Sequence, residues 1–240
     1  MTASAVEAIV FDVFGTLVDW RSGVIRTGER LDGTVDWAVI ADDWRAEYGP
    51  SLERVRTGER AWQNLDVLHR ESLLRVLEAR GVTGLDEGDL NQLVGAWHRL
   101  DPWPDVLPGL LRLRTRYLVA PLSNGHVRLL TNMAKRAGIP WDLILSAELA
   151  GQYKPAETVY RTAADLLNLA PEAVLMVAAH EGDLEASRNA GLQTAYVHRP
   201  YEWGHDTLKT TDRPDPAAYD LIVDDVLELA DQLDAPPFGR

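Results

Sequence analysis

The sequence contains no cysteine among its 240 residues, which excludes disulfide bonds and thiol chemistry and is compatible with a reducing cytoplasm. It also lacks an apolar run long enough to span a membrane, and it shows no signal peptide. Because the formal net charge is −13, nucleic acid and anionic membrane surfaces are poor partners. These absences predict a cytoplasmic globular protein with no nucleic-acid or membrane partner.

Lysine is scarce as well, with 3 lysines against 21 arginines, so a lysine at a motif position stands out. The apolar fraction of 46% is ordinary for a globular chain and sufficient for a core, and the length allows one or two domains. An anionic substrate is still permitted, because a few basic groups can reverse the field inside one cleft.

The stretch that organises the chain lies near its start. Four apolar residues, Ala8 to Phe11, run directly into Asp12, and Gly15 and Thr16 follow. A short apolar run closed by a turn signal predicts a buried strand, and a carboxylate at its end would lie where parallel sheets bind ligands. From these residues alone, the alternative is a strand followed by a polar turn that Asp12 caps.

The rest of the chain shows two patterns. Residues 20–100 have apolar positions spaced for helix faces and no strand-like run. Beyond them, apolar runs alternate with helical patterns, which predicts an α/β fold with a Rossmann-like parallel sheet and right-handed crossovers. Residues 201–219 are expected to form a polar surface loop. The expected strands lie at 117–122, 143–145, 174–177, 195–197 and 221–223, and the expected helices at 127–137, 155–167 and 183–190.

Polar residues follow two of these predicted strands. Ser123 and Asn124 can donate hydrogen bonds to an anion beside Asp12, although both residue types are also common in turns. Lys154 precedes Pro155 in the loop after the third strand. A buried lysine beside Asp12 would keep the aspartate ionised by charge attraction, whereas the alternative is a solvated loop lysine.

The string from Phe11 to Trp20 resembles the first motif of the haloacid dehalogenase superfamily, in the branch that hydrolyses 2-haloacids. The resemblance implies that Asp12 is a nucleophile. Most members of the superfamily are phosphatases, which carry a second acid two residues after the first. Phe14 stands at that place here, which points away from phosphoryl transfer.

The same resemblance bears on metal ions. In the phosphatases the segment that matches Ala178-Ala179-His180 and Asp183 carries the acids that hold magnesium, and only Asp183 remains here. A hard divalent cation needs several oxygen ligands, so the resemblance implies no metal and no cofactor. The Ala-Ala-His form resembles a side branch of the 2-haloacid dehalogenases. His180 either contacts the hydrolytic water or the Asp12 carbonyl, or it is a structural histidine.

The resemblance further implies a domain organisation and a set of roles. A helical cap domain at 20–100 would close over a core domain formed by 1–19 and 101–240, and the family suggests a homodimer. Arg45 in the cap would steady the departing halide, and Trp62 would line the pocket or pack inside the cap. The expected catalytic residues are Asp12, Thr16, Arg45, Lys154, His180 and Asp183, and the expected substrate-binding residues are Val13, Phe14, Arg45, Trp62, Ser123, Asn124 and Tyr160.

The motifs predict a metal-independent hydrolase that removes halide from short 2-haloalkanoic acids, such as haloacetates and 2-halopropionate, through an ester on Asp12. One alternative is a phosphatase of the same superfamily, which would need the second acid and the metal ligands. Another is a non-catalytic protein that binds a small carboxylate, which would have no need of Asp12, Lys154 and Asp183 together.

Overall fold

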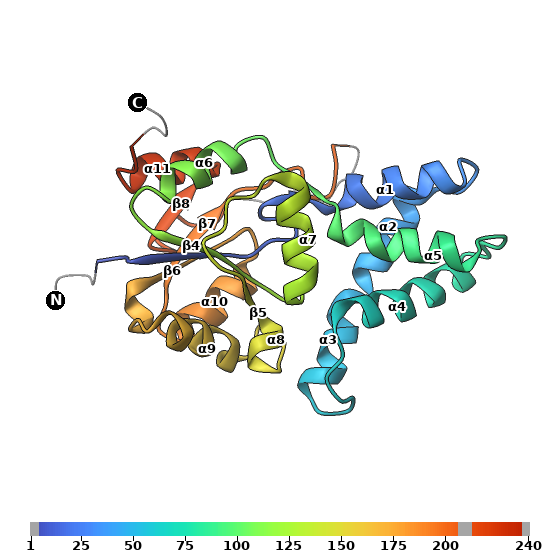
Figure 1. Ribbon diagram of the computed structural model, residues 1–240, viewed down its shortest axis with the longest axis horizontal. Helices are drawn as coiled ribbons and strands as arrows, with labels where there is room; N and C mark the ends of the chain where they lie inside the picture. The colour runs from blue at the N-terminus through green and yellow to red at the C-terminus, as the bar shows by residue number, and fades with distance from the viewer. Residues whose placement is uncertain (1–4, 206–212, 237–240) are drawn as a thin grey trace.

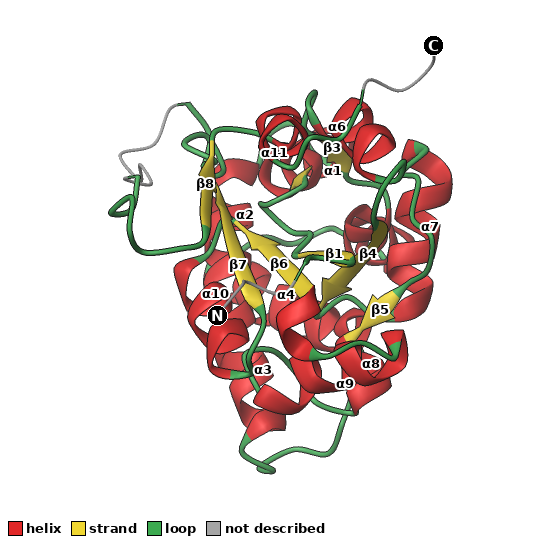
Figure 2. Ribbon diagram, turned by 90° about the vertical axis from the view of Figure 1, so that its left-hand side faces the viewer, coloured by secondary structure: helices red, strands yellow, loops and turns green. Residues whose placement is uncertain are grey.

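The computed structural model describes residues 5–205 and 213–236. Six strands form its central sheet: β1 (Ala8–Phe11), β4 (Leu118–Ser123), β5 (Leu145–Ser146), β6 (Val174–Ala178), β7 (Gln193–Val197) and β8 (Leu221–Val223). They follow the order β5-β4-β1-β6-β7-β8, and each neighbouring pair is parallel (Figure 2). The predicted α/β fold with a parallel sheet is therefore confirmed.

Strand β1 lies in the middle of the sheet, between β4 and β6. Its four residues are buried, and Val10 is paired with Ala120 on one side and Met176 on the other. This position explains the uninterrupted apolar run, because strands buried on both faces have no solvated side for polar residues. Asp12 follows β1 directly, so the fold places its carboxylate at the middle of the sheet's carboxyl edge.

Helices cover both faces of the sheet (Figure 1). Helix α6 (Val106–Leu113) packs against α11 (Val226–Gln232) on one face, whereas α9 (Glu157–Leu167) and α10 (Glu181–Asn189) lie on the other. Helix α7 (Val127–Ala137) follows β4, and the short helix α8 (Ala147–Ala150) follows β5. Gly138 ends α7 in the left-handed conformation, as the sequence predicts.

The chain leaves the sheet after β1 and returns to it through a short ribbon, in which β2 (Val18–Asp19) runs antiparallel to β3 (Asp101–Pro102). The residues between them form what we call the helical segment, at the right of Figure 1. Asp19 starts this segment by accepting the N–H of Ser22 at 3.0 Å, an N-cap interaction. Its helices are α1 (Trp20–Leu31), α2 (Trp37–Ala46), α3 (Tyr48–Arg56), α4 (Leu65–Ala79), α5 (Glu87–Val94) and the 3-10 helix η1 (Gly95–His98).

Polar contacts join the helical segment to loops at the carboxyl edge of the sheet. Asp66 Oδ2 lies 3.5 Å from Nε2 of His126, just before α7, and His98 Nδ1 accepts a hydrogen bond from Asn132 of α7 at 3.0 Å. Tyr153, in the loop after α8, donates its hydroxyl to the backbone carbonyl of Gln63 at 2.6 Å. The segment is thereby held against the edge where Asp12 emerges.

Several predicted boundaries were wrong. The third strand is at Leu145–Ser146 rather than 143–145, and the helix expected from Pro155 begins at Glu157, because Ala156 has the extended backbone of an N-cap. Residues 201–219 are not a fully exposed loop, since Glu202 is only 2% exposed; part of that stretch, 206–212, lies outside the described residues. Among the described helices, none is long and apolar enough to cross a membrane.

Candidate active site

Asp12 is the centre of a hydrogen-bonded cluster at the carboxyl edge of the sheet. Its backbone N–H extends the sheet by donating to Val177 O at 2.9 Å, and the residue is only 7% exposed. Lys154 Nζ donates to Oδ1 at 3.0 Å, while Thr16 Oγ1 donates to Oδ2 at 2.7 Å and His180 Nδ1 lies 3.1 Å from Oδ2. Burial alone would raise the pKa of Asp12, but the Lys154 ammonium, His180 and Thr16 hold it well below its usual range. Asp12 is therefore ionised at neutral pH.

Lys154 links Asp12 to a second carboxylate. Its Nζ also donates to Asp183 Oδ2 at 2.5 Å, and Tyr160 donates its hydroxyl to Asp183 Oδ1 at 2.5 Å. Burial would lower the pKa of Lys154, yet the two carboxylates raise it above the usual range. Burial and the charge of Asp12 raise the pKa of Asp183, although the ammonium opposes them. Asp183 is thus a carboxylate with increased proton affinity.

The ammonium occupies the space between two carboxylates, where a cation would otherwise bind. The side chains of Phe14 and Ala179 contribute no carboxylate beside them, so this set of side chains does not fit a magnesium ion. Among the described residues, one group could offer three metal ligands within 4.8 Å, namely Asp66, His98 and His126, but it belongs to the contact between the helical segment and α7.

Asn124 fixes the position of Lys154 through the backbone. Its Oδ1 accepts the N–H of Lys154 at 2.7 Å, and its Nδ2 donates to the Lys154 carbonyl at 3.4 Å. Ser123, the other residue expected to contact an anion, is fully buried and its hydroxyl accepts the N–H of Gly125 at 3.1 Å. Ser123 therefore supports the turn after β4, whereas Asn124 reaches the site.

A cavity of about 300 Å³ opens beside Asp12. Arg45 and Tyr48 of the helical segment close one side of it, and the Arg45 guanidinium lies 4.4 Å from the Tyr48 ring centroid and 5.4 Å from that of Trp20. Nη1 of Arg45 is buried without a hydrogen-bond partner. A half-buried cation whose Nη1 is a buried, free donor beside a small cavity suits an anionic ligand. The lining residues are Asp12, Phe14, Arg45, Tyr48, Asn124, Lys154, Pro155, His180, Gly182 and Asp183.

Aromatic side chains from the helical segment lie behind this cavity. Phe14 meets Trp97 edge-on at 5.5 Å between ring centroids, and Trp97 stacks on Trp20 at 6.1 Å. Trp62 does not line the cavity, because its ring stacks on Tyr153 at 4.5 Å. Neither expectation for Trp62 describes this contact, because the ring packs against the loop after α8 rather than lining the cavity or packing inside the helical segment.

The side chains of three other expected site residues surround the cavity without lining it. Val13, Thr16 and Tyr160 are buried, with Thr16 and Tyr160 holding the two carboxylates rather than facing the open space. Thr16 Oγ1 also accepts the N–H of Ala179 at 3.0 Å, which ties the turn after β1 to the end of β6. Tyr160 therefore orients Asp183 and is not placed to bind substrate.

Sequence reasoning missed two polar side chains of the site, besides Pro155 and Gly182 in its lining. Tyr48 lines the cavity beside Arg45, and its place three residues later on the helical pattern was the available signal. Glu202 is 2% exposed, and both of its carboxylate oxygens lie 3.1 Å from His180 Nε2. Nothing in the polar stretch around Glu202 marks it out.

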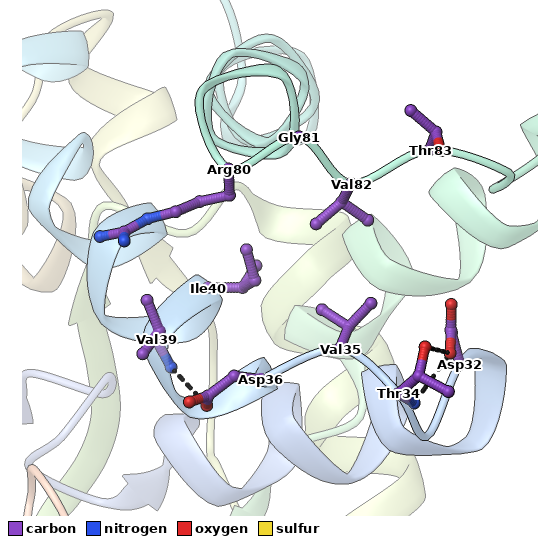
Figure 3. Close-up of a pocket in the computed structure, with 10 residues that line it drawn as sticks. All are labelled: Asp32, Thr34, Val35, Asp36, Val39, Ile40, Arg80, Gly81, Val82 and Thr83. Carbon is purple, nitrogen blue, oxygen red and sulfur yellow. Dashed lines mark hydrogen bonds between the residues drawn. The ribbon is translucent and has the colours of Figure 1, made fainter.

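A second cavity, of about 550 Å³, lies between the connection of α1 to α2 and the end of α4 (Figure 3). Val35, Val82 and Ile40 face it, and its charged residues are occupied locally: Asp36 caps α2 and Asp32 binds Thr34. None of the residues of the Asp12 cluster lines it. The site built around Asp12 is the smaller cavity.

Comparison with known proteins identifies the family. A family model described as haloacid dehalogenase-like hydrolase matches residues 6–191. The chain belongs to this family. Among its curated relatives, (S)-2-haloacid dehalogenase 4A of Burkholderia cepacia is 29% identical over 217 residues, which cover 85% of this chain and 90% of the relative. The recognition made from the first motif is confirmed.

Solved structures of haloacid dehalogenase-like hydrolases share the whole fold. A defluorinating L-2-haloacid dehalogenase has 43% identity and a TM-score of 0.91, with 96% of each chain covered. The L-2-haloacid dehalogenase of Xanthobacter autotrophicus, solved with chloropropionic acid covalently bound, has 25% identity and a TM-score of 0.81, covering 95% of this chain and 98% of that one.

Proposed function

We propose that this protein is a hydrolytic dehalogenase of short 2-haloalkanoic acids, such as haloacetates and 2-halopropionate, and that it works through an ester on Asp12. The observation that carries the proposal is the ionised Asp12 carboxylate, held by Lys154 at the edge of a small cavity whose far side offers the free Nη1 of Arg45. Phe14 stands beside Asp12 where a phosphatase needs a second acid. The named relatives, which are haloacid dehalogenases, support the same choice.

In the first step, a carboxylate oxygen of Asp12 attacks C2 of the substrate from the side opposite the halogen. The new C2–O bond forms as the carbon–halogen bond breaks, and the halide leaves with the bonding electron pair. Arg45 stabilises the charge that develops on the halide, and the surrounding aromatic side chains exclude water, which strengthens that interaction. The N–H groups of Val13 and Phe14 bind the substrate carboxylate.

In the second step, water attacks Cγ of the Asp12 ester. Asp183, with its raised pKa and its hydrogen bonds to Lys154 and Tyr160, accepts a proton from that water. The Cγ–O bond to the substrate breaks, the 2-hydroxyacid leaves after protonation of its alkoxide, and the Asp12 carboxyl group returns to its ionised form.

The organisation around this chemistry forms part of the proposal. Residues 20–100 act as a cap domain over a core of 1–19 and 101–240, because Arg45 and Tyr48 close the cavity from the helical segment. The enzyme works without a metal or other cofactor, as a homodimer in the cytoplasm.

Halide release from fluoro-, chloro- and bromoacetate and from both enantiomers of 2-chloropropionate tests the proposal. We expect release with one or more of these substrates and its loss in Asp12→Asn, because a neutral amide is a poor nucleophile. Asp165→Asn is the matched control, since Asp165 is exposed on α9. No halide release, combined with magnesium-dependent hydrolysis of a phosphate ester, would replace the proposal by the phosphatase alternative.

A further inference from the structure

Glu202 is a buried carboxylate that the reaction described above does not use. It follows β7, is 2% exposed, and places both oxygens 3.1 Å from His180 Nε2. Its Oε1 also accepts the indole N–H of Trp20 at 3.1 Å. On the other side of the ring, His180 Nδ1 lies 3.1 Å from Asp12 Oδ2. His180 therefore connects two carboxylates, one of them the nucleophile.

The fold holds Glu202 at this place through the turn after β1. Arg199 Nε donates to the Thr16 carbonyl at 2.8 Å, and the Arg199 carbonyl accepts the N–H of Glu202 at 3.2 Å. Arg199 is itself fixed by a bidentate pair with Asp105 at 2.9 and 2.7 Å. Gly15 has φ +87°, and a Cβ on it would overlap the Glu202 carboxylate. The glycine of the first motif thus also makes room for Glu202.

The charges around His180 favour its doubly protonated form. Burial would lower the pKa of His180, but Glu202 and Asp12 raise it to about 10. Burial would likewise raise the pKa of Glu202, and the neighbouring His180, with Arg45 further off, lowers it. The opposing cations near the ring are Lys154, which is bound to both Asp12 and Asp183, and Arg45 across the cavity. The ring therefore donates Nδ1–H to Asp12 and Nε2–H to Glu202.

We propose that Glu202 is a positioning residue that fixes the His180 ring and its second proton, so that Nδ1–H faces Asp12 Oδ2 throughout ester hydrolysis. This inference rests on the proposed function. Each carboxylate oxygen has two lone pairs in its plane. Both lone pairs of Oδ2 are occupied, by Thr16 and His180, whereas Oδ1 accepts one hydrogen bond, from Lys154. Oδ1 is therefore the oxygen that attacks carbon.

The consequence falls on the second step. Once Oδ1 carries the substrate carbon, Oδ2 is the ester carbonyl oxygen. When the oxygen of water bonds to Cγ, the carbonyl electron pair moves onto Oδ2, and the proton of the water passes to Asp183. When the Cγ–Oδ1 bond breaks, the pair returns from Oδ2 and the leaving alkoxide takes the proton from Asp183. His180 keeps both protons and, with Thr16, stabilises the oxyanion on Oδ2. Loss of the Glu202 charge would leave this donor neutral at high pH.

The experiment compares wild type with Glu202→Gln, which removes the charge and keeps the shape. The matched control is Glu181→Gln, because Glu181 is exposed and its carboxylate contacts Tyr219 rather than His180. Nitrogen NMR of the imidazole reports the protonation of His180 without any substrate. We expect His180 to stay protonated well above neutral pH in wild type and Glu181→Gln. In Glu202→Gln it should titrate at least about two pH units lower, nearer the ordinary value of about 6.5.

Ester hydrolysis is followed in a single turnover by the intact mass of the enzyme after mixing with chloroacetate. In Glu202→Gln, hydrolysis should slow by about tenfold or more between pH 6 and pH 9, since few His180 rings remain protonated there. Glu202→Asp should restore part of the rate at pH 9. An unchanged His180 titration, or a rate loss equal at both pH values, would overturn the inference and leave Glu202 a purely structural residue.

Failure of the proposed function would be recognised separately. If wild type releases no halide and forms no ester, the dehalogenase assignment fails, and with it the role of Glu202 in hydrolysis. The NMR titration would still decide whether Glu202 controls the protonation of His180.

Discussion

Replacing Lys154 by Met tests the charge balance of the site most severely. The ammonium is 6% exposed and lies 3.0 Å from Asp12 Oδ1 and 2.5 Å from Asp183 Oδ2, and both carboxylate side chains are 10% exposed. Met has a similar length and no charge, so Lys154→Met leaves two buried carboxylates facing one another without their shared cation. Breaking a buried ion pair by removing one partner costs about 3–5 kcal/mol. At roughly 2–4 °C per kcal/mol for a chain of this size, Tm should fall by about 6–20 °C.

The pH dependence gives the sign of the effect. In wild type the pKa of Asp12 is held below its ordinary value, so its contribution to stability is present at neutral pH and is lost only at strongly acidic pH. Without Lys154, burial and mutual repulsion raise the pKa of the carboxylate pair above that of the unfolded chain. The variant then gains stability when acid protonates one carboxylate. His180 contributes to the pH dependence of stability in both wild type and Lys154→Met. The effect of Lys154 is therefore measured by the difference between their Tm values.

Thermal unfolding of wild type, Lys154→Met and Lys135→Met between pH 8 and pH 5 measures this difference. Lys135 is exposed on α7, so its substitution controls for the loss of a lysine. We expect the difference in Tm between wild type and Lys154→Met to shrink toward pH 5. Halide release by Lys154→Met should be lost at every pH. If this difference in Tm is small, or does not change with pH, Lys154 does not compensate the charges of two buried carboxylates.

Two further predictions follow from the cavity and from the first motif. Arg45→Ala should lower the rate of dehalogenation about a hundredfold, which raises the activation free energy by about 3 kcal/mol, because the departing halide loses its charge partner. The control variant Arg54→Ala, at an exposed position, should leave the rate near normal. Equal rates for the two variants would show that Arg45 takes no part in the reaction. Activity should survive prolonged treatment with EDTA, since the side chains of Phe14 and Ala179 supply no carboxylate ligands for a metal ion. Loss on chelation, reversed by magnesium, would contradict a metal-independent mechanism.

The residues that could be predicted from the sequence share a physical property. Asp12 ends a fully apolar strand, and Lys154 is one of 3 lysines in the chain, so each differs from its local background. Parallel strands bring their carboxyl ends to one edge, and for this reason residues far apart in the sequence were expected at one site. The structure brings Asp12, Lys154, Asp183 and His180 together there.

The residues that sequence reasoning missed or misplaced depend on contacts without a local pattern. Glu202 lies in a polar stretch that looks exposed, and only the packing of Gly15 and Arg199 against it shows why it is buried. Trp62 occurs in a helical segment rich in tryptophan, and whether such a ring faces the cavity or Tyr153 depends on how the helices cross. Periodicity predicts which residues are buried, but not which buried residue faces a ligand.

The origin of the oxygen in the product shows whether Asp12 attacks carbon. A single turnover with excess enzyme is carried out in water enriched in heavy oxygen, and the 2-hydroxyacid and the peptide containing Asp12 are analysed by mass spectrometry. We predict that the new hydroxyl of the product carries ordinary oxygen, from the Asp12 carboxylate, and that the label appears in Asp12. Labelled hydroxyl in the first turnover, with unlabelled Asp12, would mean that water attacks carbon directly and that Asp12 is not the nucleophile.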